Sequence, residues 1–364
     1  MRILIPVLGF GNAGGYRVLS KLADELIDLG HEVEFLTPRE SKDPYFPTKA
    51  SINWIFENGN TKSTREYLLL SQNALKINQK ITAGLKKLGN SFDVILANHS
   101  LTILPIKRAG FLYKTLYYVQ AYEPELYEFS KSVKNKILKY FSEQSYKTKV
   151  LTIVNADIYK NYKLLRSSRV LYPGIDFNFF YSKKKEDLKN KKIIIGTIGR
   201  KEINKGTNYI LEAFYKLIKI LPNIELHIAF GSKDFQAHPN IICIYPNGDK
   251  ELGDYYRSLD YYISAGYYQQ GAFHYPVVEA MACGIPIIST NYYPVNTLNC
   301  WLTEIKNSDD IVSKFELAVN NPEERKSKVL NGLTDVKQFE WKNAAKKLEA
   351  YLLELFKNNN SILH

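Results

Sequence analysis

The chain has 364 residues and a net charge of +12, and 45% of its residues are hydrophobic. This length exceeds one ordinary hydrophobic core and predicts two domains of a globular protein. No apolar run approaches the ~20 residues of a membrane-spanning helix. The charge favours either an anionic partner or a solubilising lysine surface. No zinc spacing or aromatic RNA-binding motif accompanies it, so we expect no nucleic-acid partner.

The first half of the chain alternates apolar strands with helical patterns. Residues 2–8 lack the features of a secretory signal and predict a strand. A glycine-rich turn, an apolar pattern of helical period and a second strand at 33–36 follow, which together predict a βαβ unit with parallel strands. We expect further strands at 94–97, 115–119 and 150–154, and helices at 64–88 and 130–147.

The second half repeats this α/β pattern after a charged, core-poor linker at 181–192. We expect strands at 192–198, 224–230, 241–245, 261–264 and 285–290, and helices at 206–221, around 254–258 and from 276. Two doubly wound domains in series place ligand sites at the carboxyl ends of their strands. The three cysteines show no metal-ligand spacing and fit a reducing cytoplasm, where we expect the protein to reside.

The glycine turn has the spacing of a dinucleotide-binding loop, with glycines at Gly9, Gly11 and Gly14. Such a loop needs an acidic residue at the end of the second strand to hold the ribose. Here Glu34 lies inside that strand and Glu40 lies beyond a proline, so an NAD-dependent oxidoreductase is disfavoured. Two alternatives stay open: an anion at the N-terminus of the helix that follows, or a tight turn without a ligand.

A basic cluster in the second half predicts a diphosphate site. Arg200 follows the end of a strand, and Lys205 precedes a helix start. A guanidinium and an ammonium placed there would neutralise a diphosphate. Glu279, expected on the first turn of a later helix, could hold ribose hydroxyls or interact with the helix dipole.

These segments resemble known motifs in their order and spacing. They are Gly14–Leu19, Gly30–Val33, Tyr172–Asp176, Gly199–Gly206, Glu279–Pro286 and Phe339–Trp341. Together they cover nearly the whole chain and resemble the retaining glycosyltransferases of family 4. The resemblance implies an α/β GT-B fold, with two doubly wound Rossmann-like domains facing across a cleft. It places an acceptor-side domain at 1–176, a nucleotide-sugar domain at 177–337, and a C-terminal helix at 338–356 that crosses back to the first domain.

The resemblance also implies how a nucleotide-diphosphate sugar is held. Arg200 and Lys205 would bind the diphosphate and Glu279 the ribose, as catalytic residues. The other donor-binding residues implied are Gly14, Gly15, Gly199, Phe273, His274 and Tyr275. No Asp-x-Asp cluster lies near this site, and the family is generally metal-independent. We therefore expect neither a metal nor a cofactor.

Two departures from the family pattern affect the expected activity. Gly271 stands where many members have the first glutamate of a Glu-x7-Glu pair, with Gln270 beside it. In the first domain, residues 119–124 replace a catalytic histidine and resemble the bacterial rhamnan-type transferases. Glu123 in this segment is then either the residue that orients or deprotonates the acceptor hydroxyl or a surface loop acid. The other acceptor-side residues expected are His99, Gln120 and Tyr122.

The expected function is transfer of a hexosyl or deoxyhexosyl group, rhamnosyl among them, to a glycan or lipid-linked glycan. Residues 130–141 alternate lysines with apolar residues, which suits a helix on an anionic membrane surface or an ordinary helix packed by its apolar stripe. Peripheral contact with the inner face of the membrane is therefore open. Two alternatives remain for the function, a catalytically weak nucleotide-sugar-binding protein and a nucleotide-sugar epimerase of the same fold.

Overall fold

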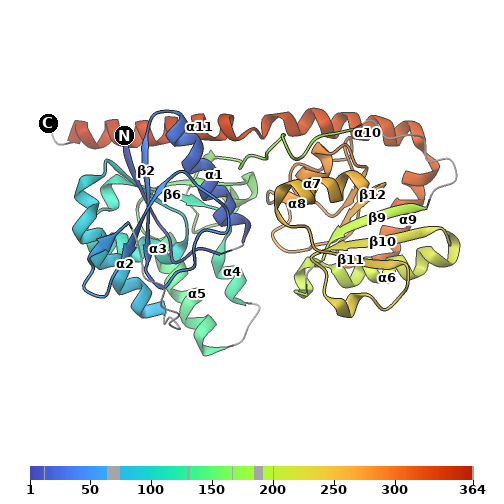
Figure 1. Ribbon diagram of the computed structural model, residues 1–364, viewed down its shortest axis with the longest axis horizontal. Coiled ribbons are helices and arrows are strands. Elements are labelled where there is room, and N and C mark those ends of the chain that lie inside the picture. The colour runs from blue at the N-terminus through green and yellow to red at the C-terminus, as the bar shows by residue number, and fades with distance from the viewer. Residues whose placement is uncertain are drawn as a thin grey trace. The chain divides into compact units, whose positions relative to one another are not determined.

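The computed structural model describes residues 1–11, 13–63, 74–128, 132–165, 167–183, 192–199 and 201–362. The chain divides into two compact units (Figure 1). Unit 1 comprises Met1–Gly174 and Trp341–His364, and unit 2 comprises Ile175–Glu340. The sequence placed the corresponding boundaries at 176 and 338. None of the described helices is both long and apolar enough to cross a membrane.

Unit 1 is built on an eight-stranded sheet with the order β4-β3-β2-β1-β5-β6-β7-β8. Its neighbouring strands are parallel, except for the antiparallel pair β3 and β4. The strands are β1 (Arg2–Pro6), β2 (Glu32–Pro38), β3 (Ser51–Ile55), β4 (Thr61–Lys62), β5 (Val94–Ala97), β6 (Thr115–Val119), β7 (Leu151–Val154) and β8 (Arg169–Val170). The strand order reverses between β1 and β5, which is where ligands bind in such sheets.

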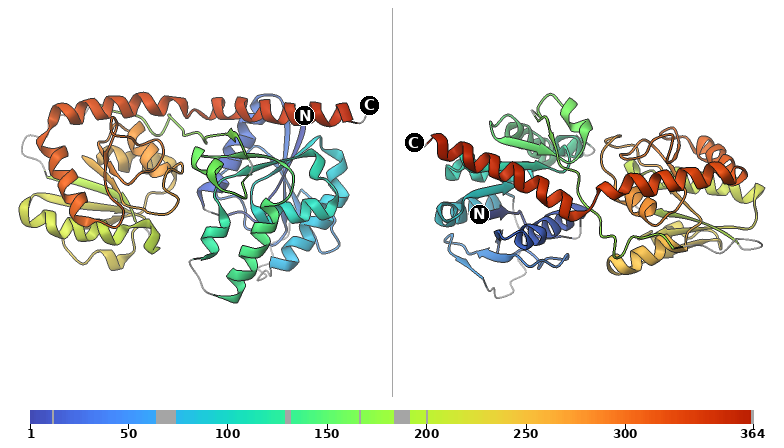
Figure 2. Two further views of the ribbon diagram at one scale, coloured as in Figure 1. Left: turned by 180° about the vertical axis from the view of Figure 1, so that it is seen from behind. Right: turned by 90° about the horizontal axis from the view of Figure 1, so that it is seen from above.

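Helices cover both faces of this sheet. One face carries α1 (Gly14–Asp28) and the C-terminal α11 (Trp341–Ile362), which lie side by side in Figure 2. The other carries α2 (Ala74–Leu88), α3 (Ser100–Ala109), α4 (Glu123–Glu128) and α5 (Val133–Tyr146). The apolar stripe of α11 is fully buried at Leu348 and Leu352, and Glu349 lies 2.9 Å from the His31 ring. The last helix is therefore part of the unit 1 core.

Unit 2 has a six-stranded parallel sheet with the order β11-β10-β9-β12-β13-β14. Its strands are β9 (Ile193–Ile198), β10 (Ile224–Ala229), β11 (Ile241–Ile244), β12 (Tyr261–Ser264), β13 (Ile287–Ser289) and β14 (Trp301–Leu302). Its helices are α6 (Thr207–Ile220), α7 (Gly248–Ser258), α8 (Tyr275–Ala282), α9 (Ser308–Asn320) and α10 (Pro322–Asp335). The order reverses between β9 and β12, so this unit too has a switch point.

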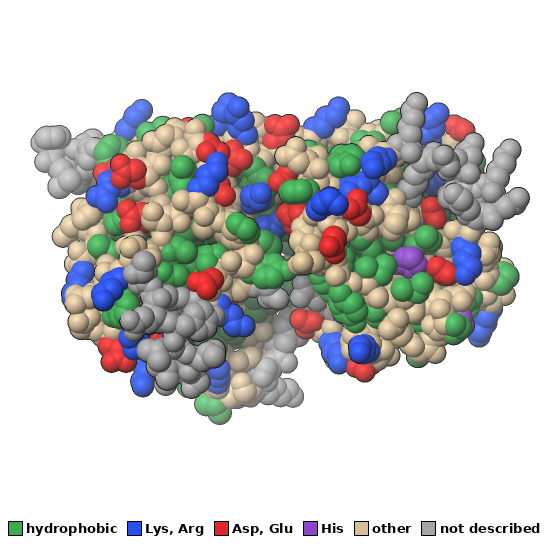
Figure 3. All heavy atoms as spheres, viewed as in Figure 1, with side chains coloured by type: hydrophobic (Ala, Val, Ile, Leu, Met, Phe, Trp, Pro, Cys, Tyr) green, Lys and Arg blue, Asp and Glu red, His purple; other side chains and the backbone are tan. Residues whose placement is uncertain are grey.

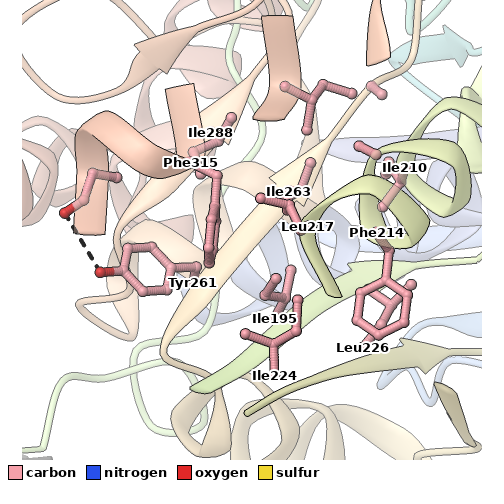
Figure 4. Close-up of a cluster of buried hydrophobic side chains, with 14 of the residues drawn as sticks. Ile195, Ile210, Phe214, Leu217, Ile224, Leu226, Tyr261, Ile263, Ile288 and Phe315 are labelled. Carbon is pink, nitrogen blue, oxygen red and sulfur yellow. Dashed lines mark hydrogen bonds between the residues drawn. The ribbon is translucent and has the colours of Figure 1, made fainter. Parts of the chain in front are cut away.

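The core of unit 2 fills the space between its sheet and helices α6 and α9. Phe214 of α6 and Phe315 of α9 are each at most 1% exposed and pack over strand residues such as Ile195 and Ile263 (Figure 4). At the edge of this cluster the Tyr261 hydroxyl lies 3.5 Å from the carbonyl oxygen of Ala318. This core fixes the strand ends that form the candidate donor site.

Several elements differ from the sequence-based expectation. The short strands β3, β4, β8 and β14 and the helices α3, α4, α9 and α10 were not predicted. Of the helix expected at 64–88, the structure describes 74–88, and most of the linker expected at 181–192 lies outside the described residues. Short strands and a proline-containing helix such as α3 carry too little periodic signal to be read from sequence.

Candidate functional site

Glycines let two loops meet at the switch point of unit 2. Gly206 caps α6 with a φ of +73°, and a Cβ there would lie 2.0 Å from the carbonyl oxygen of Ala265, just after β12. The N–H of Tyr267 also donates to the Asn204 carbonyl at 3.0 Å. Because only glycine has no Cβ, this position needs glycine. The β9–α6 loop therefore lies directly against the end of β12.

Gly199 shows a second close approach, at the end of β9. A Cβ on this residue would lie 2.3 Å from Cγ2 of Ile228 and 2.8 Å from Cα of Gly231. Its N–H donates to the carbonyl of Ala229 at 2.7 Å. The carboxyl ends of β9 and β10 are thus drawn together beside the predicted phosphate site.

Lys205 stands at the N-terminus of α6. It is the last residue of a 3-10 turn, Ile203–Lys205, and its side chain is exposed. The helix dipole and N–H groups at this end favour an anion, and the ammonium adds a full positive charge. Its predicted partner Arg200 lies outside the described residues. The neighbouring Lys201 is instead paired with Asp234, 2.7 Å away.

Glu279 lies inside unit 2 rather than on the first turn of a helix. It is the fifth residue of α8, so the expected dipole interaction at the first turn is wrong. Its side chain is 2% exposed, and Oε2 accepts a hydrogen bond of 3.0 Å from the Tyr256 hydroxyl of α7. Burial and the nearby carboxylate raise the pKa of Tyr256 well above its usual value. The ribose-binding role of Glu279 stays a prediction.

Aromatic side chains line the approach to α8. Phe273 and Tyr275 meet edge to face with centroids 5.2 Å apart. The His274 ring is stacked on Tyr292, 4.3 Å away and tilted by 15°. The predicted donor residues in this loop therefore form a rigid aromatic group just before the helix.

Gly271, the position at which the sequence departs from the resembled family pattern, adopts a backbone conformation that favours glycine. Its φ is +87°, and its N–H donates to the Asn291 carbonyl at 2.6 Å. The amide of Gln270 donates to the Gly266 carbonyl at 2.9 Å. The loop therefore uses the Gln270 side chain to hold its own backbone and offers no carboxylate at position 271.

In unit 1, Gln120 connects the end of β6 to the start of α1. Its amide nitrogen lies 3.3 Å from the Gly15 carbonyl, and its own carbonyl accepts a 2.7 Å hydrogen bond from Asn155. Gly14 is the first residue of α1 and is exposed. Gln120, predicted on the acceptor side, is therefore placed against the glycine turn that was predicted to face the donor.

Glu123 is a buried carboxylate with a donor on each oxygen. It begins α4 and is 5% exposed, so its interpretation as a surface loop acid is wrong. Oε1 accepts from the Ser100 N–H at 3.2 Å, and Oε2 accepts from the Tyr146 hydroxyl. Burial and the Glu123 charge raise the pKa of Tyr146 well above its usual value. Tyr146 was missed in the sequence because nothing in its helical pattern separates it from a packing residue.

His99 and Tyr122 complete this group at the carboxyl ends of β5 and β6. His99 caps α3, with Nδ1 accepting from the Leu101 N–H at 3.0 Å, and lies 3.9 Å from Oε1 of Glu123. Its side chain is 32% exposed. The Tyr122 ring contacts Tyr146 at a centroid distance of 5.1 Å, and burial raises the pKa of Tyr122 to about 12. The three predicted acceptor-side residues therefore lie with Glu123 at the carboxyl ends of these strands.

The charge distribution shows where ions could bind. In the face drawn in Figure 3, lysine and arginine side chains are spread among acidic ones over both units. Within the described ranges, no three His, Cys, Asp or Glu side chains gather as a metal site.

Each of the two doubly wound units has its own switch point, and α11 returns to unit 1. These features define the GT-B fold and confirm the expected fold class. Residues 179–332 match the family model for "Glycosyl transferases group 1", and they include Gly199, Lys205 and Glu279. The matched segment lies within unit 2.

Known proteins similar to the full chain are distant in sequence. An uncharacterized glycosyltransferase of Haemophilus influenzae is 23% identical over 338 residues, which are 87% of this chain and 90% of the relative. Sucrose-phosphate synthase from Thermosynechococcus elongatus has a TM-score of 0.75 at 13% identity, covering 98% and 99% of the two chains. Anabaena HepE in complex with UDP-glucose has a TM-score of 0.71 at 15% identity, covering 97% and 100%. WaaG, a glycosyltransferase involved in lipopolysaccharide biosynthesis, has a TM-score of 0.68 at 12% identity, covering 96% and 99%.

Proposed function

We propose that this protein is a retaining, metal-independent glycosyltransferase. It moves a hexosyl or deoxyhexosyl group from a nucleotide-diphosphate sugar to a glycan or lipid-linked glycan. The observation that carries the proposal is the match of residues 179–332 to the group 1 glycosyl transferase model. These residues lie in unit 2, where Lys205 stands at a helix N-terminus beside the switch point. The UDP-glucose complex of Anabaena HepE supports a nucleotide sugar as donor.

The proposed reaction breaks the bond between sugar C1 and the diphosphate oxygen and forms a bond from C1 to the acceptor oxygen. Negative charge develops on the departing diphosphate. Lys205, Arg200 and the N-terminus of α6 stabilise that charge, and fixed cations act most strongly where charge develops. In unit 1, Gly14 and Gly15 begin α1, whose N-terminus can also bind an anion.

The acceptor proton leaves with the phosphate in this proposal. Both oxygens of Glu123 accept hydrogen bonds, from Ser100 and Tyr146, and the Nδ1 of His99 accepts one from Leu101. Because both oxygens of Glu123 hold donors of unit 1, we assign Glu123 to orientation of the acceptor, through the adjacent His99. The departing phosphate oxygen takes the proton from the acceptor hydroxyl as the new bond forms.

We further propose that unit 1 contacts an anionic membrane from the cytoplasmic side through α5. Val133, Ile137 and Tyr140 are 73%, 51% and 58% exposed and are spaced so that they share one helix face. In the apolar stripe that could pack this helix on unit 1, Leu138 is half-buried, whereas Val133 and Ile137 are exposed. Exposed Lys134 and Lys136 are sequence neighbours of this face, as expected for a helix at an anionic interface.

Vesicle sedimentation tests the membrane contact. We expect binding to phosphatidylglycerol vesicles and not to phosphatidylcholine vesicles, and loss of that binding in the Val133→Glu/Ile137→Glu double variant. The matched control is Ile220→Glu/Leu330→Glu, whose residues are 57% and 56% exposed on unit 2. Equal loss in both double variants, or binding unaffected in both, removes α5 as the contact.

A nucleotide-sugar screen tests the function. Thermal shift with a panel of nucleotide sugars identifies the donor, since a ligand at 100 times its Kd adds ~2.7 kcal/mol to stability. Donor consumption with added glycan acceptors is then followed by mass spectrometry, and a transferred sugar supports the proposal. A catalytically weak binding protein, which the carboxylate-free position Gly271 favours, would bind the donor without turnover. Interconversion of donors without an acceptor would indicate an epimerase.

A further inference from the structure

Unit 1 contains a cavity of about 390 Å³ away from the carboxyl ends of its strands. It lies by the amino ends of β6 and β7, where Thr115 and Leu151 begin these strands, and it extends to Leu355 of α11. Small-molecule sites usually measure ~300–1,000 Å³. The cavity is thus large enough for a small ligand and belongs to neither of the two candidate half-sites.

The lining of the cavity combines an apolar interior with positive charge. Leucines from four segments supply apolar surface, and two of them, Leu165 and Leu355, are buried. Lys147 and Lys149 line the cavity and are exposed, so their charges lie where it meets solvent. None of the described lining residues is an aspartate or a glutamate. A ligand that matches these walls has an apolar body and an anionic head.

One wall of the cavity is shared with the acceptor-side group. Tyr146, the last residue of α5, lines the cavity, and its hydroxyl donates to Oε2 of Glu123. Tyr117 lines it too, and its ring stacks on Tyr146 with centroids 5.7 Å apart. A ligand in the cavity would therefore contact the side chain that holds Glu123.

We propose that this cavity binds a small anionic amphiphile, with a phosphate or carboxylate head at Lys147 and Lys149 and its apolar body against the leucines. The occupant touches Tyr146, whose hydroxyl donates to Glu123. The cavity is then an effector site of unit 1, separate from the donor and acceptor positions. Its ligand chemistry is shared by free amphiphilic metabolites and by lipids extracted from a membrane.

Titration calorimetry with octyl phosphate, below its micelle concentration and without donor or acceptor, tests the proposal on the full chain. We expect saturable binding with one site. Inorganic phosphate has only the head, and octanol only the body, so both should bind at least 10-fold more weakly. Equal binding of octanol and octyl phosphate, or no binding of octyl phosphate, overturns the proposal. A short-chain phosphatidylglycerol that binds more tightly than octyl phosphate would identify a lipid as the source.

Two sets of variants locate the binding. Lys147→Glu/Lys149→Glu reverses charges at exposed positions and should weaken octyl phosphate at least 10-fold. Lys86→Glu/Lys87→Glu changes the net charge equally on exposed positions outside the cavity and should change Kd less than 2-fold. Tyr113→Ala, which removes a 55% exposed ring from the lining, should also weaken binding. Similar effects of both lysine pairs would show a nonspecific charge response and contradict the site. Since the measurement uses no donor or acceptor, failure here leaves the transferase proposal intact.

Discussion

The hydroxyl of Tyr146 donates to Oε2 of Glu123, although the two residues are 23 positions apart and come from different helices. Oε1 of the same carboxylate accepts from the first N–H of α3. A buried carboxylate is costly unless its oxygens are hydrogen-bonded. The pair therefore explains how unit 1 keeps a carboxylate beside His99 at the end of its sheet.

Removing this hydrogen bond should impair transfer without affecting the donor. Tyr146→Phe leaves a buried oxygen of Glu123 without its hydroxyl donor, which we expect to cost ~1–3 kcal/mol of unfolding free energy. The matched control is Tyr118→Phe, which removes a buried 3.0 Å hydrogen bond to the Leu171 carbonyl. Urea unfolding should show similar losses in both variants, whereas only Tyr146→Phe should reduce the transfer rate. Equal activity in the two variants would separate Tyr146 from function.

Lys205 and Arg200 should each contribute to diphosphate binding. We expect Lys205→Ala and Arg200→Ala to weaken the nucleoside diphosphate in titration calorimetry, and to slow transfer by ~10²–10³ if they act like oxyanion donors. Lys201→Ala is the control, because that ammonium is paired with Asp234. If Lys201→Ala lowers the diphosphate affinity as much as Lys205→Ala and Arg200→Ala do, the diphosphate does not bind at this helix. The same conclusion holds if Lys205→Ala and Arg200→Ala both leave the affinity unchanged.

Gly206 should be irreplaceable for a steric reason beyond its positive φ. In Gly206→Ala the new Cβ meets the Ala265 carbonyl, whereas at Gly248, with φ +79°, a Cβ meets nothing within 4 Å. The conformational cost of ~1–2 kcal/mol is shared by both. We therefore expect Gly248→Ala to lower the free energy of unfolding by about that amount. Gly206→Ala should lower it distinctly more and should also weaken donor binding. Chemical denaturation of both variants measures the difference, and equal losses would contradict the contact.

Glu279 and Glu123 should fail differently. Glu279→Ala should weaken donor binding and turnover, and Glu279→Gln, which can still accept from Tyr256, tests the same role with less disturbance of packing. Glu123→Gln should leave donor Kd nearly unchanged and lower kcat. Donor Kd and kcat of these variants, measured with the true acceptor, give the answer. Full kcat in Glu123→Gln, or parental donor affinity in Glu279→Ala, would show that the proposed roles are wrong.

Transfer should continue in excess chelator. The proposed reaction neutralises the diphosphate with Arg200, Lys205 and a helix N-terminus, and so needs no divalent cation. We expect the same initial rate with and without EDTA. Loss of activity in EDTA that Mg²⁺ or Mn²⁺ restores would contradict this.

The sequence predicted the elements that have strong local signals. The strands at 94–97, 115–119 and 261–264 match β5, β6 and β12, because each is a short apolar run buried on both faces of a parallel sheet. The helix expected at 206–221 matches α6. Lys205 was likewise placed at a helix start from residue spacing alone.

The sequence could not predict contacts that depend on long-range packing. The burial of Glu123 and Glu279 follows from tyrosines on neighbouring helices, and nothing near either glutamate in the sequence indicates those partners. The positive φ of Gly271 depends on how its loop pairs with Asn291. In the same way, the cavity beside Lys147 depends on Leu355 of α11, which lines it together with residues of β6 and β7.

The return of α11 to unit 1 has a consequence for how the chain is made. Unit 2 is complete at Glu340, but unit 1 lacks Leu348 and Leu352 from its core until the last segment has been synthesised. Domains generally fold as units while the ribosome extends the chain. Unit 2 can therefore reach its native state first. In unit 1, the surfaces of the sheet and of α1 that α11 covers stay exposed until α11 has emerged.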